Sequence, residues 1–213
     1  MTKARVLLAD DHKIVAEGLR GLLEPEFKLV GVVEDGRELL KKAEELSPDV
    51  IVADITMPSL NGIEAVEQLK KAGSKAKVVF LTMHHDVTYA NRAFEVGASG
   101  FVLKHSAPDE LITAIREALK GRKYVTPMIA GELMESYKSG TGFQKGVFKK
   151  LTSRQREVLQ LLAEGKSAKE IAKILHISAR TVEFHKYHIM EELGIKTSAE
   201  LVQFAIKHGI ITI

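Results

Sequence analysis

The sequence of 213 residues contains no cysteine and no tryptophan. Without cysteine the chain can form neither a disulfide framework nor a thiolate metal site. It also lacks any run of about 18 apolar residues, so we expect no membrane-spanning helix. Its first residues lead directly into an apolar segment and show no signal-peptide pattern. These absences favour a cytoplasmic protein that has no membrane partner.

Charge is distributed unevenly along the chain. Residues 1–122 contain 17 lysines and arginines against 19 aspartates and glutamates, a net charge of −2, whereas residues 148–213 contain 11 against 7, a net charge of +4. Between them, at 123–147, glycine, serine and threonine are frequent, which is typical of a linker, and residues 127–137 could form a short helix within it. We therefore expect two domains, at 1–122 and 148–213, and the basic one weakly indicates a nucleic-acid partner.

Short apolar segments alternate with amphipathic segments in residues 1–122. The apolar segments lie at 4–9, 28–34, 49–54, 77–82 and 100–104, and helical spacing follows at 13–23, 37–46, 62–71, 87–96 and 107–120. Ser106 and Asp109 could cap the last of these helices. The alternation predicts an α/β domain, a doubly wound parallel sheet of five strands with helices on both faces.

The ends of the predicted strands carry polar side chains. Asp10 and Asp11 follow the first strand, and Asp54, Thr82 and Lys104 end the third, fourth and fifth. In a parallel sheet these residues gather at one edge, where open α/β sheets bind their ligands. Neighbouring carboxylates repel one another unless a cation is present, and hard oxygen ligands suit Mg²⁺. An aspartate at such a site can itself act as a nucleophile and form an acyl phosphate.

Each of these residues alone has a simpler explanation. Asp10 and Asp11 could cap a helix, Thr82 is ordinary strand composition, and Lys104 could be a surface amine. Their joint appearance at successive strand ends is what favours a phosphoryl site. Together with Met57-Pro58 and Asn61-Gly62, the pattern resembles the receiver domain of two-component response regulators over about residues 3–122.

The resemblance implies a flavodoxin-like fold and assigns roles. Asp54 would be the phosphoacceptor, and Mg²⁺ would be held by Asp11, Asp54 and the carbonyl of Thr56, with Asp10 acting through water. Thr82 and Lys104 would grip the phosphoryl group. Phe101 falls at the position of the family's switch aromatic, although plain core packing explains it equally well. The chain would be no enzyme beyond self-catalysed phosphotransfer and dephosphorylation.

The sequence departs from the receiver pattern at three positions. Met83 stands where receivers often have a small residue, and Thr56 and His84 stand two residues beyond Asp54 and Thr82. In the family these last two positions help to set how fast the phosphoryl group is lost. The departures therefore affect the expected lifetime of the modified state and leave the chemistry unchanged.

Residues 148–213 show four helices with clear start signals. Capping boxes begin at Thr152, Ser167 and Thr197, and Ser178 can cap a further helix from Ala179 to about Leu193. A helix at 168–175, a three-residue turn and this longer helix form a helix-turn-helix pattern, which by itself is only moderately specific. The wider pattern, from Leu151-Thr152 to Leu193-Gly194, resembles the LuxR-type DNA-binding domain.

Together the two halves resemble the NarL/FixJ class of response regulators. The resemblance implies a sensor histidine kinase and double-stranded DNA as partners, and a homodimer when the chain is phosphorylated. Side chains of the recognition helix would reach base edges or phosphates, and a lysine on the helix before it could contact phosphate. The candidate DNA-contacting residues are Lys169, Arg180, Thr181, Glu183, Phe184, Lys186 and Tyr187.

Two other functions fit part of the sequence. A phosphatase of the haloacid dehalogenase type also uses an aspartyl phosphate, but it would have a second aspartate where this chain has Thr56. A receiver could also control a protein- or RNA-binding output. Duplex-DNA binding that depends on salt separates this alternative from a transcription factor.

Overall fold

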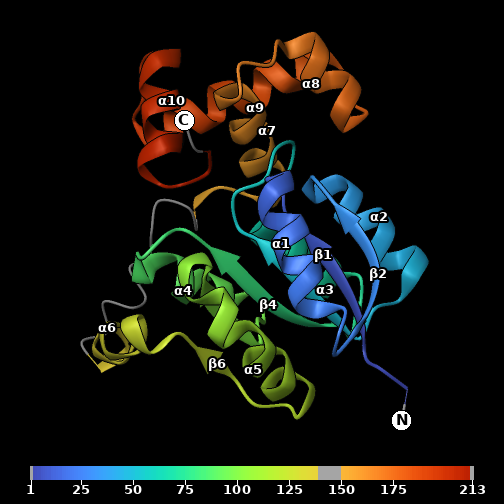
Figure 1. Cartoon of the computed structure of the whole chain (residues 1–213). Helices are drawn as coiled ribbons and strands as arrows, with labels where there is room; N and C mark the ends of the chain where they lie inside the picture. Colours follow the sequence, from blue (N-terminus) through green and yellow to red (C-terminus); the bar gives the residue numbers. More distant parts are fainter. Residues whose placement is uncertain (1, 139–149, 212–213) are drawn as a thin grey trace. The chain divides into compact units, whose positions relative to one another are not determined.

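The computed structural model describes residues 2–138 and 150–211 (Figure 1). The chain divides into two compact units, one containing the β-sheet and the other containing the C-terminal helices. Each unit has a hydrophobic core of its own. The predicted boundaries at 122 and 148 remain predictions, and residues 139–147 of the expected linker lie outside the described residues.

The first unit is built on a parallel sheet of six strands. Their order is β2-β1-β3-β4-β5-β6, and every neighbouring pair is parallel. This confirms the doubly wound α/β class but corrects the predicted strand count of five. The sixth strand contains only two residues, too few to give a periodic pattern in the sequence. The strands are Arg5–Ala9 (β1), Lys28–Val33 (β2), Val50–Asp54 (β3), Lys77–Thr82 (β4), Gly100–Leu103 (β5) and Tyr124–Val125 (β6).

Helices α1 to α5 connect these strands, α6 follows the last of them, and three of the six helices begin at a side-chain cap. Asp35, Asn61 and Asp86 accept backbone N–H groups at the starts of α2, α3 and α4. Ser106 makes no such bond, so the predicted cap is wrong: a 3₁₀ turn at Lys104–Ser106 leads the backbone into the helix already in αR geometry. The helices are Lys13–Leu23 (α1), Gly36–Leu46 (α2), Gly62–Lys71 (α3), Val87–Glu95 (α4), Ala107–Leu119 (α5) and Pro127–Lys138 (α6).

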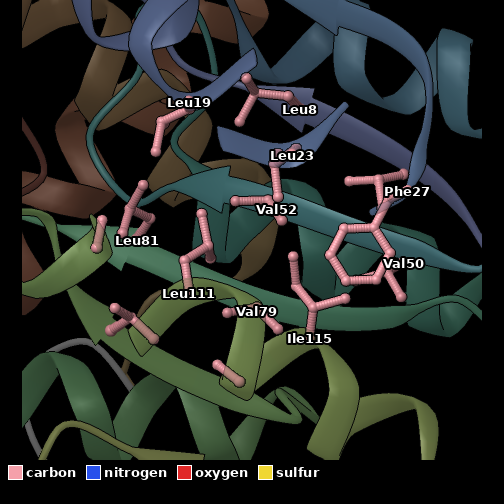
Figure 2. Close-up of a cluster of buried hydrophobic side chains, with 14 of the residues drawn as sticks. Leu8, Leu19, Leu23, Phe27, Val50, Val52, Val79, Leu81, Leu111 and Ile115 are labelled. Carbon is pink, nitrogen blue, oxygen red and sulfur yellow. The ribbon is translucent and has the colours of Figure 1, made fainter. Parts of the chain in front are cut away.

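Both faces of the sheet are buried. Alternate strand residues such as Val52 and Leu81 pack against Leu19 of α1 and Leu111 of α5 (Figure 2). Residues one position along point to the opposite face, and those, such as Phe80, are also fully buried. Strands buried on both sides are nearly continuous apolar runs, which is why they were recognisable in the sequence.

The order of the strands fixes where a ligand can bind. The chain runs from β1 outward to β2 and then returns to β3 on the other side of β1. At such a reversal the loops after the two strands diverge and leave a crevice at their carboxyl ends. Asp10 follows β1 and Asp54 ends β3, so both lie at this crevice.

The second unit is all helical, as predicted. It comprises α7 (Ser153–Ala163), α8 (Ala168–Leu175), α9 (Ala179–Leu193) and α10 (Ser198–Lys207) around a core that includes Val158, Ile171, Val182 and Ile189. Between α8 and α9 the turn passes through His176 in the left-handed conformation, with φ 53°.

Helix caps in this unit follow the predicted positions with one difference. Reciprocal capping boxes form at Thr152 with Gln155 and at Ser167 with Glu170. At α10 the Thr197 side chain accepts the Glu200 N–H, but the Glu200 carboxylate accepts from the N–H of Lys196 instead. The third box is therefore only half formed, because the carboxylate reaches a donor one residue further back.

Candidate functional site

Two buried carboxylates and a lysine meet at the crevice between β1 and β3. Asp10 and Asp54 are 1 % and 5 % exposed. The Nζ atom of Lys104 lies 2.8 Å from Oδ2 of Asp10 and 2.7 Å from Oδ2 of Asp54. Lys104 comes from the start of the 3₁₀ turn after β5, so three strand ends supply the cluster. One buried cation therefore holds two buried anions at a common point.

The electrostatics of this cluster favour an additional positive charge. Burial, with a smaller contribution from Asp10, raises the pKa of Asp54 and Lys104 only partly offsets this, so that the pKa stands at about 6. Burial disfavours the charge of Lys104, but the carboxylates of Asp54 and Asp10 prevail and raise its pKa. A single lysine does not fully compensate these carboxylates, so the site is suited to bind a cation.

Asp11 and His12 complete an acidic group at the rim. Nδ1 of His12 lies 2.9 Å from Oδ1 of Asp11, and ligand atoms of Asp10, Asp11, His12 and Asp54 all lie within 4.8 Å of one another. The three carboxylates supply the hard oxygen ligands that Mg²⁺ prefers. His12 was missed in the sequence, although its position directly after two aspartates was a usable signal.

A close backbone contact shapes the loop after Asp54. Gly62 donates its N–H to the carbonyl of Ile55 over 2.8 Å. A Cβ at Gly62 would lie 2.0 Å from the carbonyl oxygen of Asp54, so any other residue would displace the loop after Asp54. The sequence contained this glycine as part of a motif, but only the structure gives its physical reason.

Thr56 and His84 are joined at the mouth of the crevice. The Thr56 N–H donates to Oδ1 of Asp54 over 3.3 Å, and its hydroxyl lies 3.0 Å from Nε2 of His84. The His84 ring stacks on Tyr89, with a centroid distance of 4.6 Å, and burial lowers its pKa. Two of the three positions that depart from the receiver pattern thus contact each other beside Asp54.

Thr82 and Phe101 lie on neighbouring strands and are fully buried. The Thr82 hydroxyl accepts the N–H of His84 over 3.1 Å, which places Thr82 next to the Thr56–His84 pair. Phe101 is paired in register with Phe80 on β4. Its burial fits both core packing and a switch aromatic in an inward position, so the switch role stays a prediction.

The candidate DNA-contacting residues cluster on α9. Glu183, Phe184 and Tyr187 are exposed, and the two aromatic side chains are 60 % and 69 % exposed. Arg180, at the second position of the helix, and Lys169, on α8, are also exposed. Exposed aromatic rings beside charged groups leave an apolar surface in water, which is typical of an interaction site.

Two other candidates have local contacts. Thr181 donates its N–H to Oγ of Ser178, and the two hydroxyls lie 2.8 Å apart. Lys186 is only half-exposed. The Thr181 side chain therefore helps to fix the start of α9, and the fully exposed face of the helix is narrower than the sequence predicted.

Comparisons with known proteins agree with both units. Residues 6–116 match the response regulator receiver domain, and residues 149–205 match the bacterial regulatory proteins of the luxR family. The chain belongs to the response regulators of two-component systems, in the NarL/FixJ class that joins a receiver domain to a LuxR-type DNA-binding domain.

Similar proteins cover nearly the whole chain. The transcriptional regulatory protein DegU of Brevibacillus brevis is 34 % identical over 223 residues, which cover 97 % of this chain and 94 % of DegU. The oxygen regulatory protein NreC of Staphylococcus aureus is 35 % identical over 214 residues, which cover 97 % of this chain and 99 % of NreC. RcsB of Salmonella enterica serovar Typhimurium, solved bound to a promoter in the presence of the phosphomimetic BeF₃⁻, is 30 % identical with a TM-score of 0.64, covering 95 % of this chain and 98 % of RcsB.

Within residues 2–138 and 150–211, no helix is both long enough and apolar enough to cross a membrane.

Proposed function

We propose that Asp54 accepts a phosphoryl group from a sensor histidine kinase and thereby controls the binding of the C-terminal unit to DNA. The observation that carries this proposal is the contact of Lys104 with both Asp54 and Asp10 at the crevice of a receiver sheet. A carboxylate that is buried at a strand end and open to a crevice is placed for attack on a phosphorus atom.

In the proposed phosphoryl transfer, an O–P bond to Asp54 forms while the P–N bond to the kinase's histidine breaks. An oxygen of the Asp54 carboxylate attacks the phosphorus, the P–N bond to the kinase's histidine breaks, and the electron pair returns to the imidazole. Lys104 then moves its contact from the carboxylate to a phosphoryl oxygen, and the Thr82 hydroxyl donates to another. Both groups stabilise charge on the transferred phosphoryl group without a covalent step of their own.

Mg²⁺ is the metal that the site would hold. Its ligands would be Asp11, Asp54 and the carbonyl of Thr56, with Asp10 acting through water. The fit is supported by the excess of buried carboxylate over the single Lys104 charge and by the grouping of the acidic ligand atoms. When bound, the ion neutralises charge on the phosphoryl oxygens. Removing it should leave Asp54 paired with Lys104 and unreactive.

The output is sequence-specific binding to double-stranded DNA by a dimer. Glu183, Phe184 and Tyr187 would face the major groove, whereas Arg180, Lys186 and Lys169 would contact phosphates. Thr181 would hold the start of α9 and meet the backbone there. The solved complex of RcsB with promoter DNA supports this output for a similar chain.

These roles assign a function to each segment of the chain. We place the receiver at 1–122, the linker at 123–147 and the DNA-binding domain at 148–213, and we place the protein in the cytoplasm. Phosphorylation would shift the receiver between two populated states, and Phe101 would change its packing between them.

The test uses phosphorylation by a small acyl-phosphate donor, followed by the mass of the intact protein. Wild type should gain one phosphoryl group with Mg²⁺ and almost none with a chelator. Asp54→Asn should stay unlabelled, and the matched variant Asp49→Asn, at the opposite end of the same strand, should be labelled like wild type. Labelling of Asp54→Asn at the wild-type level would overturn the assignment.

A further inference from the structure

Thr126 makes hydrogen bonds that tie the segment after α5 both to β5 and to α5 itself. It is 1 % exposed. Its N–H donates to the carbonyl of Phe101 over 3.0 Å. Its hydroxyl accepts the N–H of Leu103 over 3.1 Å and donates to Oε2 of Glu110 over 2.7 Å. A buried hydroxyl that is used both as donor and as acceptor holds its neighbours at fixed positions.

These bonds lie next to Lys104, the lysine of the proposed phosphorylation site. Leu103 is the last residue of β5 and precedes Lys104, whose Nζ atom contacts Asp54 and Asp10. The ladder between β5 and β6 pairs Phe101 with Val125 and then stops, because β6 ends there. The Thr126 hydroxyl takes the place of the next ladder acceptor. It thereby satisfies the last N–H of the strand that presents Lys104.

Beyond Thr126 the chain enters α6, which packs on α4. The carbonyl of Thr126 accepts the N–H of Ile129 over 3.1 Å. Ile129 and Leu133 are buried. Nδ2 of Asn91 donates to Oγ of Ser136 over 3.3 Å, which joins α4 to α6. Helix α6 is the last described element of the first unit, so a shift at Thr126 reaches the chain beyond residue 138 through a helix that is already docked.

We propose that Thr126 is a positioning residue that couples Lys104 to α6. This inference rests on the proposed function, because it requires Lys104 to change partner when Asp54 is modified. The end of β5 then moves with Lys104, and the two bonds to Leu103 and Phe101 carry Thr126 along. Helix α6 then shifts with Thr126 and changes its packing against α4. Phosphorylation is thus signalled along β5 to α6, which lies within the segment placed as the linker.

A purely structural role makes a different prediction. If Thr126 only completes the edge of the sheet, its loss should lower stability equally with and without modification. Thr126→Val keeps the shape of the side chain and removes both hydroxyl bonds. Thr126→Ser keeps the hydroxyl and should restore the wild-type response. Thr113→Val, at an exposed position of α5, is the matched control.

The experiment measures amide hydrogen exchange in the full chain before and after treatment with beryllium fluoride and Mg²⁺. In wild type, Thr126→Ser and Thr113→Val, this treatment should change exchange in 127–138. In Thr126→Val that change should fall at least fivefold, although the β3 and β4 amides near Asp54 still respond. Glu110→Gln weakens the bond that orients the hydroxyl and also alters the contact of Glu110 with Tyr124. It should give a smaller loss, and it replaces Thr126→Val in the test if the valine variant does not fold.

The outcomes separate the two proposals. A full α6 response in Thr126→Val, or in Glu110→Gln where the valine variant does not fold, overturns the coupling. So does an equal loss in Thr126→Ser and Thr126→Val. If wild type shows no response near Asp54 and takes no phosphoryl group from an acyl-phosphate donor, the proposed function itself is wrong.

Discussion

At the scale of single residues, Asp54 acts against the stability of the fold. Burial raises its pKa from 3.8 to about 6, which means that the folded chain holds its proton more tightly than the unfolded chain does. The contribution of Asp54 to the free energy of unfolding therefore falls as pH rises from about 4 to about 6 and stays low above that. A rise of this size corresponds to about 3 kcal/mol at neutral pH. The carboxylate that we propose as the phosphoacceptor is thus buried in spite of this loss.

Asp54→Asn should consequently stabilise the protein at neutral pH. Without divalent cations we expect the free energy of unfolding to rise by about 1–3 kcal/mol at pH 7.5 and to change little at pH 4, where Asp54 is already protonated. Urea unfolding followed by circular dichroism measures both values. Adding Mg²⁺ should stabilise wild type and leave the variant unchanged. A variant less stable than wild type at pH 7.5 would show that the bond to Lys104 outweighs burial.

Most of this site could be predicted from the sequence because it lies at strand ends. Asp10, Asp54 and Lys104 each end an apolar run, and a parallel sheet brings such ends together. His12 and Thr126 could not be found in this way. His12 precedes a helix and its signal is its position after two aspartates, whereas Thr126 follows a strand of two residues and contacts residues of β5 and α5 far from it in the sequence.

At the scale of elements, α9 carries the residues that would distinguish one DNA sequence from another. Glu183 is exposed on this helix, and a carboxylate near phosphates is repelled unless it gains a partner such as a cytosine amino group. An alternative is that Glu183 only pairs with Lys186, three residues along the helix. The two side chains therefore need separate tests.

Glu183→Gln should alter base preference at one position of the operator, by roughly 1–3 kcal/mol. Lys186→Ala should instead weaken binding to operator and scrambled DNA alike and flatten the salt dependence by about one unit. Fluorescence anisotropy at several salt concentrations measures both effects. Lys41→Ala, an exposed lysine of α2, controls for the loss of charge. Equal tightening on both DNAs by Glu183→Gln would mean that Glu183 contacts no base.

Local signals predicted helices better than strands. The boxes at Thr152 and Ser167 formed as expected because a capping box involves only four consecutive residues. Ser106 failed as a cap because the preceding 3₁₀ turn had already set the backbone. The sixth strand was missed because its pairing depends on β5, which is more than twenty residues earlier in the chain.

At the scale of the whole molecule, two separate cores support two functions. The sheet unit buries residues of α1, α5 and four strands, and the helical unit buries residues of α7 to α10. Each core lies within its own segment of the chain, apart from the linker. Substitutions in one core should therefore leave the secondary structure of the other unit intact.

We expect the two residues of β6 to keep the receiver dispersed in solution. They cover the outer edge of β5, which would otherwise present unpaired N–H and carbonyl groups to a strand of another molecule. A chain that ends after residue 122 should associate through this bare edge, whereas one that ends after 138 should remain monodisperse. Light scattering at matched concentrations measures the difference, and equal scattering would contradict it. A receiver truncated after residue 122, where the composition changes, should therefore aggregate through its exposed β5 edge.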